Sequence, residues 1–360
     1  GADSTAAIAF GGEPTTTITE QWNGTNWTEV SDMSTSRYDP GGTGTQPAGL
    51  VFGGTVPPST TATEEWNLNI VTGAWTTGGS MNTARTKLAG SGIQTASLAF
   101  GGESLTAITE SYNGSSWTEV NDLNTARKNL SGAGYGSNTY ALAFGGLVGT
   151  PASSALTESW GGSSWTEVND LNTHRRGLGG AGTYTSALAF GGQAYPSTGN
   201  LAVTESWNGT NWTEVNDLNT ARLQFAGAGA DNTSALAFGG SDGTPGYQNE
   251  TELWNGTNWT EVNNLNSARA QLAGAGIATS ALAIGGRLDS GGSPEEFAGT
   301  EVWNGTNWTE NGDLNTARQY LAASGTYTSG LAFGGETPSV TASTEEWSGV
   351  VDTTVTFSDS

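Results

Sequence analysis

TESWNGTNWTEVNDLNTAR, at residues 204–222, recurs with small changes along the 360-residue chain. Residues 109–127 read TESYNGSSWTEVNDLNTAR, and residues 157–175 read TESWGGSSWTEVNDLNTHR. Such self-similarity is the signature of a protein built from repeated structural units, in which each unit needs its neighbours to bury its apolar residues. The period of the repeat therefore decides the fold.

A Gly-Gly pair marks each repeat, and successive pairs are about 46 residues apart, in the range of four-stranded propeller blades. The pairs stand at 11–12, 53–54, 101–102, 145–146, 191–192, 239–240, 285–286 and 334–335. The period predicts an all-β protein, a single closed β-propeller of four-stranded antiparallel blades.

Four segments in each repeat read as strands. In residues 234–238 (SALAF) both alternating faces are apolar, which predicts a strand covered on both sides. The next strand is the T-E-x-W/Y segment, and the Asn-Gly of W-N-G-T-N-W predicts a tight hairpin to the strand that starts at the second Trp. The Ala- and Gly-rich segment 223–229 fits the innermost strand, where large side chains would collide. No segment has a helical period, so we expect essentially no helix.

These motifs together resemble the kelch repeat: an apolar strand, Gly-Gly, an aromatic in the third strand, a Trp opening the fourth strand and a closing Arg. The resemblance covers nearly the whole chain and implies a propeller. The chain departs from the family pattern because the third-strand aromatic is mostly Trp, with Tyr112 as the exception, and because only the repeat from Trp66 to Trp75 has a long hairpin.

The number of strands predicts the number of blades. Eight Gly-Gly strands and eight T-E-x-W/Y strands favour eight blades over the alternative of seven. We therefore expect one propeller over residues 1–360. Its tail, 348–360, would supply the outer strand of the last blade or the missing inner strand of the first, and so close the ring.

Composition excludes several classes of function. The net charge of −23 would repel nucleic acid, and no apolar run is long enough for membrane insertion. The chain has no Cys and one His, His174. The copper site of the galactose oxidase family, which the kelch resemblance brings to mind, needs two His and a Cys-linked Tyr and is excluded. We expect no cofactor; calcium bound by Asp289, Glu295 and Glu296 is the weaker alternative.

The repeated charged residues are predicted to be framework ion pairs, because Arg binds a buried carboxylate through two hydrogen bonds and ties strands together. The paired Trp residues are predicted to pack blade against blade. The Arg residues are Arg37, Arg85, Arg127, Arg175, Arg222, Arg269 and Arg318, and the Glu residues are Glu20, Glu64, Glu110, Glu158, Glu205, Glu252, Glu301 and Glu345.

Binding is expected where the repeats differ, which is in the segments that follow each Gly-Gly. These second-to-third-strand loops would share one face of the disc with the fourth-to-first-strand turns. The candidate ligand contacts are Tyr195, Tyr247, Arg287 and Phe297. The alternative is that these loops are ordinary tolerant surface loops.

The sequence leaves three classes of function. We expect no enzyme but a structural or recognition module, extracellular or on a virion surface such as a phage tail or fibre, that binds protein or surface glycan and belongs to a larger symmetric assembly. A secreted bacterial adhesin or lectin is an alternative within this class. The other two classes are a carbohydrate-active enzyme that uses carboxylates and an intracellular adaptor like many kelch proteins.

Overall fold

The chain divides into two compact units, Gly73–Gly349 and Gly1–Thr72 with Val350–Ser360. The structure, a computed structural model, describes residues 7–22, 26–30, 32–45, 48–55, 63–68, 73–149, 152–196, 199–243, 247–290, 293–349 and 355–359. These residues form strands, turns and loops and contain no helix. The sequence predicted one propeller over 1–360, whereas the structure has two units, which we describe separately.

The unit Gly73–Gly349, called the ring below, consists of six four-stranded antiparallel sheets. The strands of each blade are given from the innermost outwards. The first three blades are β8 (Ala89–Ile93), β9 (Ala96–Phe100), β10 (Thr109–Tyr112) and β11 (Trp117–Val120); β12 (Ser131–Ala133), β13 (Ala141–Phe144), β14 (Thr157–Trp160) and β15 (Trp165–Val168); and β16 (Gly179–Gly182), β17 (Ala187–Phe190), β18 (Thr204–Trp207) and β19 (Trp212–Val215). The fourth to sixth blades are β20 (Ala226–Asp231), β21 (Ser234–Phe238), β22 (Thr251–Trp254) and β23 (Trp259–Val262); β24 (Ala273–Ile277), β25 (Ser280–Ile284), β28 (Thr300–Trp303) and β29 (Trp308–Asn311); and β30 (Ala322–Gly325), β31 (Ser329–Phe333), β34 (Thr344–Ser348) and β7 (Ala74–Thr77).

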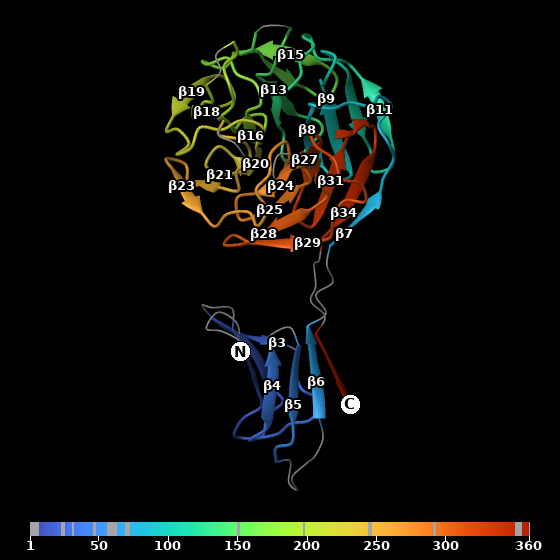
Figure 1. The fold of residues 1–360 in the computed structure, drawn as a ribbon, viewed down its shortest axis with the longest axis vertical. Helices are drawn as coiled ribbons and strands as arrows, with labels where there is room; N and C mark the ends of the chain where they lie inside the picture. Colours follow the sequence, from blue (N-terminus) through green and yellow to red (C-terminus); the bar gives the residue numbers. More distant parts are fainter. Residues whose placement is uncertain are drawn as a thin grey trace. The chain divides into compact units, whose positions relative to one another are not determined.

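The ring closes with six blades, and Figure 1 shows the resulting disc with its small inner strands around the axis. The inner strands contact one another in the order β8, β12, β16, β20, β24, β30 and back to β8. The predicted fold class, an all-β propeller without helix, is confirmed. The predicted single ring of eight blades, with seven as the alternative, is wrong, because the sixth blade packs directly on the first through Phe333 and Trp117.

One contact repeats between blades and sets the curvature. A Phe from the second strand of one blade meets the Trp that opens the fourth strand of the next, as for Phe144 and Trp212, whose ring centroids are 5.1 Å apart. The glycines of the inner strand make room for the Phe, since a Cβ on Gly227 would lie 2.7 Å from Phe190. Small inner residues and large outer ones therefore shape each blade as a wedge.

The last blade takes its outer strand from the start of the ring. Strand β7 pairs with β34, with Trp75 opposite Trp347, so that strands from the two ends of the unit complete one sheet. The tail strand β35 (Val355–Asp359) pairs instead with β6 (Thr63–Leu68). The tail is therefore an outer strand, as one alternative predicted, but of the sheet that contains β6, because β7 fills the outer position of the last blade.

The other unit, called the two-sheet unit below, holds a three-stranded and a four-stranded antiparallel sheet. The first consists of β1 (Ala7–Phe10), β2 (Thr19–Trp22) and β3 (Trp27–Val30), and the second has the order β35-β6-β5-β4, with β5 (Ala48–Phe52) and β4 (Gly41–Thr45). The strands β1 and β4 are in contact. This unit thus contains two blades of the same repeat, outside the closed ring of six.

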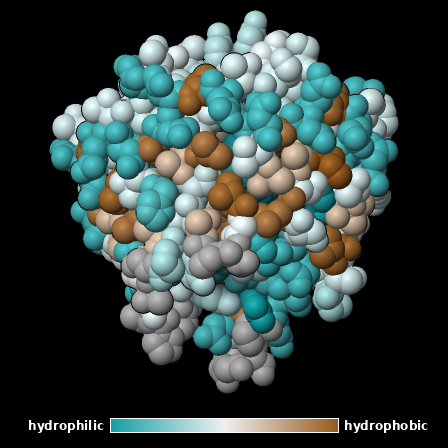
Figure 2. All heavy atoms as spheres, turned by 90° about the horizontal axis from the view of Figure 1, so that it is seen from above, coloured by the Kyte–Doolittle hydropathy of each residue, from teal (hydrophilic) through white to brown (hydrophobic). Residues whose placement is uncertain are grey.

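The surface matches the acidic composition. Figure 2 shows a face on which hydrophilic residues predominate and hydrophobic residues lie between them in scattered groups. Within the described part of the chain, no helix is long and apolar enough to cross a membrane.

Candidate functional site at the mouth of the ring channel

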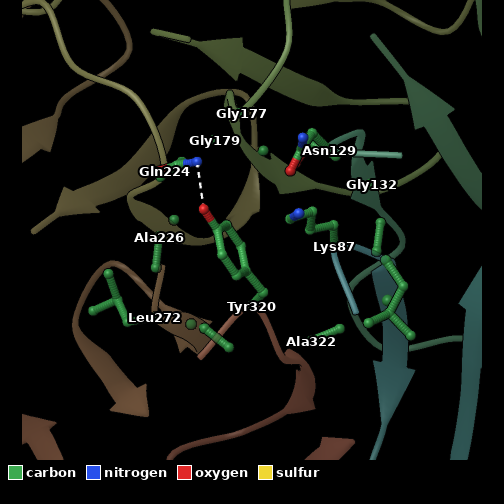
Figure 3. A pocket seen from close by; sticks show the side chains of 18 of the residues that line it. Lys87, Asn129, Gly132, Gly177, Gly179, Gln224, Ala226, Leu272, Tyr320 and Ala322 are labelled. Carbon is green, nitrogen blue, oxygen red and sulfur yellow. Dashed lines mark hydrogen bonds between the residues drawn. The ribbon is translucent and has the colours of Figure 1, made fainter. Parts of the chain in front are cut away.

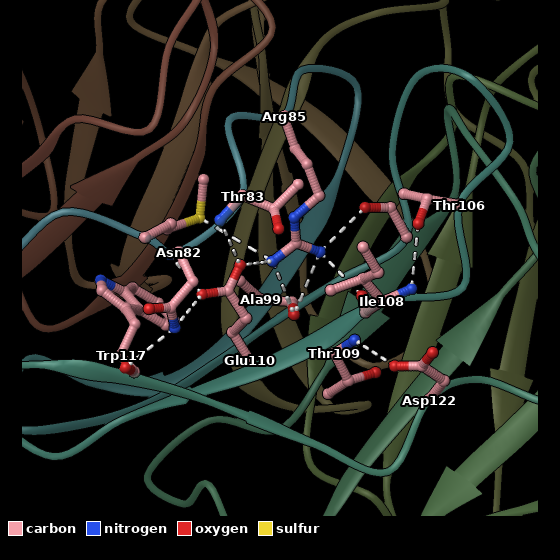
Figure 4. Close-up of polar contacts among 12 residues, drawn as sticks. Asn82, Thr83, Arg85, Ala99, Thr106, Ile108, Thr109, Glu110, Trp117 and Asp122 are labelled. Atoms are coloured by element: carbon pink, nitrogen blue, oxygen red, sulfur yellow. Dashed lines mark hydrogen bonds and ion pairs between the residues drawn. The ribbon is translucent and has the colours of Figure 1, made fainter.

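The framework arginines lie buried between blades. Arg85 donates from Nη2 to Oε1 of Glu110 at 2.9 Å and from Nη1 to the carbonyl of Ile108 at 2.7 Å (Figure 4). The second oxygen of Glu110 accepts hydrogen bonds from the backbone and side chain of Asn82. Burial lowers the pKa of Arg85, while the charge of Glu110 opposes this shift. The guanidinium is therefore buried and bound within the protein through its Nη groups, whereas its Nε has no hydrogen-bond partner among the described residues.

The same pairing recurs at every framework arginine, each joined to the Glu of the following repeat. The pairs are Arg37–Glu64, Arg85–Glu110, Arg127–Glu158, Arg175–Glu205, Arg222–Glu252, Arg269–Glu301 and Arg318–Glu345. Glu20, the remaining Glu of the motif, is exposed and forms no ion pair with a residue that the structure describes.

The mouth of the channel is built from the residue two positions after each ring arginine. Six backbone hydrogen bonds of 2.7–3.1 Å join these residues in a closed circle, each N–H donating to the carbonyl of the residue in the preceding blade. All six have φ between 52° and 61°. They are Lys87, Asn129, Gly177, Gln224, Gln271 and Tyr320, called the mouth residues below.

Only Gly177 adopts this left-handed backbone without steric cost. The other five positions carry side chains in a conformation that costs of order 1 kcal/mol or more each. Backbone strain of this kind, kept in a repeated framework, is concentrated at functional sites. The mouth residues therefore mark a candidate binding site at the end of the channel.

The mouth side chains converge on a cavity of about 160 Å³. Tyr320 reaches across it, and its hydroxyl accepts a hydrogen bond of 2.9 Å from Nε2 of Gln224 (Figure 3). Gln271 donates from Nε2 to Oε1 of Gln224 at 3.2 Å. Gln271 is 8% exposed and its own Oε1 has no hydrogen-bond partner. A buried acceptor without a partner is costly, and a ligand donor at this point would satisfy it.

The protonation states at the mouth follow from burial and charge. Burial raises the pKa of Tyr320 to about 12, so the phenol stays protonated at neutral pH. Lys87 lies over the Tyr320 ring, with Nζ 5.0 Å from the centroid, and also donates to Glu103 at 2.7 Å. Partial burial opposes ionisation of Glu103, but Lys128 and Lys87 bind it and lower its pKa to about 2. The mouth thus offers amides, one phenol and one ammonium group.

A second circle surrounds the mouth residues. In it, the residue after a framework arginine pairs by its backbone with the residue after Gly-Gly, as for Lys128 with Leu147, Arg176 with Gln193 and Ala270 with Arg287. The chain has 11 cationic residues, and seven are the framework arginines. The other four, Lys87, Lys128, Arg176 and Arg287, all belong to these two circles. A strongly acidic protein therefore keeps its remaining cations on one face.

Two of the four candidate ligand contacts pack on framework or loop arginines. Phe297 is half-buried, with its ring 5.2 Å from the Arg269 guanidinium. Tyr195 lies 5.3 Å from Arg176, and its backbone N–H donates to Ser153, whose hydroxyl is 2.6 Å from Nδ1 of His174. These two aromatic residues hold neighbouring loops together.

The other two candidates lie close enough to the mouth to act on Tyr320. Arg287 opens a loop hairpin of β26 (Arg287–Ser290) and β27 (Ser293–Glu296), and its charge lowers the pKa of Tyr320, whereas Tyr247 raises it. Asp289 and Glu295 lie on opposite strands of this hairpin, and Glu296 stands opposite Arg287. The described residues contain no group of three His, Cys, Asp or Glu placed to hold a metal ion. A second hairpin, β32 (Glu336–Thr337) and β33 (Ser339–Val340), lies in the last loop.

The cavity at the opposite end of the channel is lined by few side chains that could bind a ligand. This cavity of about 70 Å³ is lined mostly by Gly, Ala and Ser of the inner strands. Tyr140 and Tyr184, on hairpins that join first and second strands, stack on each other there with ring centroids 4.5 Å apart. Of these two cavities, the one at the mouth combines space for a ligand with several polar side chains, as binding sites do.

The sequence predicts binding in the loops after Gly-Gly, whereas the mouth residues were not among the predicted contacts. The sequence does contain a signal, because one position varies between repeats although its surroundings are constant. This position lies two residues after the repeated Arg and directly before a Leu or Phe, and it is occupied by Lys, Asn, Gly, Gln, Gln and Tyr in the six ring repeats. The positive φ at that position and the circle of hydrogen bonds are not visible in the sequence.

The fold and the six-bladed ring define a β-propeller. A search of solved structures finds YjhT, described as "Structure of YjhT", with a TM-score of 0.64, at 14% sequence identity over 78% of this chain and 99% of that chain. YjhT is a kelch-repeat propeller protein, and the likeness at this identity concerns the fold. No family model matches the chain, and no curated protein matches it.

Proposed function

We propose that this protein is a non-catalytic recognition module with kelch-type blades, displayed outside the cell or on a virus particle, that binds a surface glycan through the loop face. The observation that carries the proposal is the mouth of the channel. There, six near-identical blades place different side chains in one circle, and Gln271 keeps a buried oxygen without a partner.

The chemistry of the mouth favours a hydroxyl-rich ligand. The cavity wall offers both donors and acceptors, from the amide groups of Asn129, Gln224 and Gln271, the phenol of Tyr320 and the ammonium group of Lys87. The cavity of about 160 Å³ is smaller than the roughly 300–1,000 Å³ of a pocket for a whole small molecule. It would therefore hold one terminal residue of a longer chain, while the surrounding loops contact the rest.

A glycan array tests the proposal with the full chain and three variants. Gln271→Gly removes the unpartnered amide and relieves the left-handed backbone, so the fold is kept while binding should fall at least tenfold. Tyr320→Phe removes the hydroxyl alone and should weaken binding less. Tyr327→Ala is the control, since Tyr327 is 40% exposed on a hairpin that joins first and second strands, away from the mouth.

The outcomes separate the alternatives. Binding that Gln271→Gly removes and Tyr327→Ala leaves unchanged supports the mouth as the glycan site. Binding that neither variant changes would overturn it. If no glycan binds and a protein from the host surface binds instead, with the same dependence on Gln271, the site stands and the ligand class is wrong.

A further inference from the structure

The two-sheet unit leaves two blade faces uncovered. Trp27, which opens β3, is 47% exposed, and Phe52, which ends β5, is 42% exposed. Their counterparts in the ring are buried, with Trp212 5% exposed and Phe238 0% exposed. Aromatic side chains whose counterparts in the ring are almost fully buried are thus open to solvent here.

The two uncovered faces are different and belong to opposite ends of a short arc of two blades. The first sheet packs on the second as one ring blade packs on the next: a Cβ on Gly42 would lie 3.6 Å from Phe10, and Arg37 pairs with Glu64. The face with Phe52 therefore corresponds to the face of a ring blade that contacts the next blade along the chain, called the leading face. The face with Trp27 corresponds to the face that contacts the Phe of the preceding blade, called the trailing face.

The ring shows what each open face is shaped to meet. Between blades the leading Phe lies 4.8–5.1 Å from the trailing Trp, as in Phe238–Trp308 and Phe144–Trp212. The same Trp donates from Nε1 to a Thr that opens the third strand of the preceding blade. In the two-sheet unit this Thr is Thr63, which is only partly buried. The two open faces thus carry the residues of both sides of the contact between blades, Phe52 and Thr63 on one face and Trp27 on the other, without forming the contact.

We propose that the two-sheet unit docks head-to-tail on a second copy of this chain, with Phe52 and Thr63 of one copy against Trp27 of the next. Contacts between unlike faces form closed rings when the rotation allows it. Each step between blades of a six-bladed ring covers a sixth of a turn, so an arc of two blades covers a third. Three copies therefore close a second ring of six sheets, in which sheets of three and four strands alternate.

The end of β6 and the start of β35, the points of the two-sheet unit nearest in sequence to the ring, lie on the two outer strands of one sheet. The assembly would carry three copies of the ligand-binding mouth, and such multivalency raises avidity by about 10²–10⁴ without new contacts.

The mass of the full chain in solution tests this proposal. We expect wild-type protein at tens of micromolar to have three times the mass of the 36.8 kDa chain in light scattering and native mass spectrometry. Trp27→Asp and Phe52→Asp should each abolish the trimer, and because both residues are exposed, neither change should affect folding. Val340→Asp, at a Val that is 43% exposed in a loop of the ring, is the matched control and should remain trimeric.

Mixing the two variants distinguishes this interface from any other. The Trp27→Asp protein keeps an intact Phe52 face, and the Phe52→Asp protein keeps an intact Trp27 face. The mixture should therefore form a heterodimer and no larger assembly. A monomeric wild type overturns the proposal. So does a dimer of wild type, or a trimer that survives Trp27→Asp, since either result places the interface elsewhere.

Discussion

The ring and the two-sheet unit are made from one repeat but give its residues different surroundings. Trp212 in the ring is 5% exposed and Trp27 in the two-sheet unit is 47% exposed. Glu252 is buried against Arg222, whereas Glu20 is exposed. The repeated residues therefore stabilise the contact between blades and not the single blade. Each of them contributes stability only where a neighbouring blade completes that contact.

Removing the Trp should show the largest difference between the two units. Trp212→Ala leaves a cavity between blades and should destabilise the ring by about 3–5 kcal/mol. Trp27→Ala, measured at a concentration at which the chain is monomeric, should cost below about 1 kcal/mol because the side chain is half solvated. Urea unfolding followed by circular dichroism measures both. Equal losses would contradict the comparison.

Removing one carboxylate should have the next largest effect. Glu252→Gln leaves Arg222 as a buried charge without its counterion, which costs about 3 kcal/mol, near the lower end for broken buried pairs because Gln can still bind Asn219. Glu20→Gln is the matched control in the two-sheet unit and should change stability by less than about 0.5 kcal/mol. Thermal unfolding of the two variants at pH 7 checks the difference, which should disappear if the ring pairs contribute nothing.

A single hydrogen bond offers a finer test. In the ring, Trp212 donates from Nε1 to the hydroxyl of Thr157 at 3.1 Å. Thr157→Val removes this acceptor while keeping most of the side-chain volume, and should cost about 1–2 kcal/mol because the buried indole N–H loses its partner. Thr63, the counterpart of Thr157 in the two-sheet unit, is only partly buried, so Thr63→Val should cost less.

Urea unfolding of the two variants, followed by circular dichroism, measures both losses. A Thr157→Val variant as stable as the wild type would contradict the contribution of this hydrogen bond.

The smallest expected effect depends on pH. The pKa of Glu103 is lowered to about 2, so its bridge to Lys87 and Lys128 contributes stability above the unfolded pKa of about 4.5 and loses it as pH falls through about 2. Wild type and Glu103→Gln should therefore differ in their urea midpoints at pH 7 and pH 4 and converge near pH 2. A convergence already complete at pH 4 would contradict the lowered pKa of Glu103.

The sequence predicted the blade in detail. The apolar strand SALAF is β21, and W-N-G-T-N-W forms the hairpin in which Trp207 stands opposite Trp212. These features are local, because alternation and an Asn-Gly turn need only a few residues. The closed ring of six was not predictable, since blade number depends on small rotations between packed sheets and not on how many repeats the chain contains.

The exchange of outer strands had a local signal. Most repeats join their third and fourth strands by a tight Asn-Gly turn, which forces the two strands to pair. The repeat from Trp66 to Trp75 lacks that turn, and here β6 and β7 pair with other strands. A long hairpin in one repeat therefore marks the place where the chain can leave one sheet for another. The mouth residues gave a weaker signal, because side-chain variation does not reveal backbone strain.

The pairing of β7 with β34 also decides how the ring responds to tension. Ala74 stands opposite Ser348, so the two ends of the ring leave from the same end of one antiparallel pair. A force applied through Gly73 and Gly349 would load the hydrogen bonds of that pair one at a time, as in unzipping, and not all together. Because the other five sheets are each formed by consecutive strands of the chain, the propeller would open at this seam first and could close again along it.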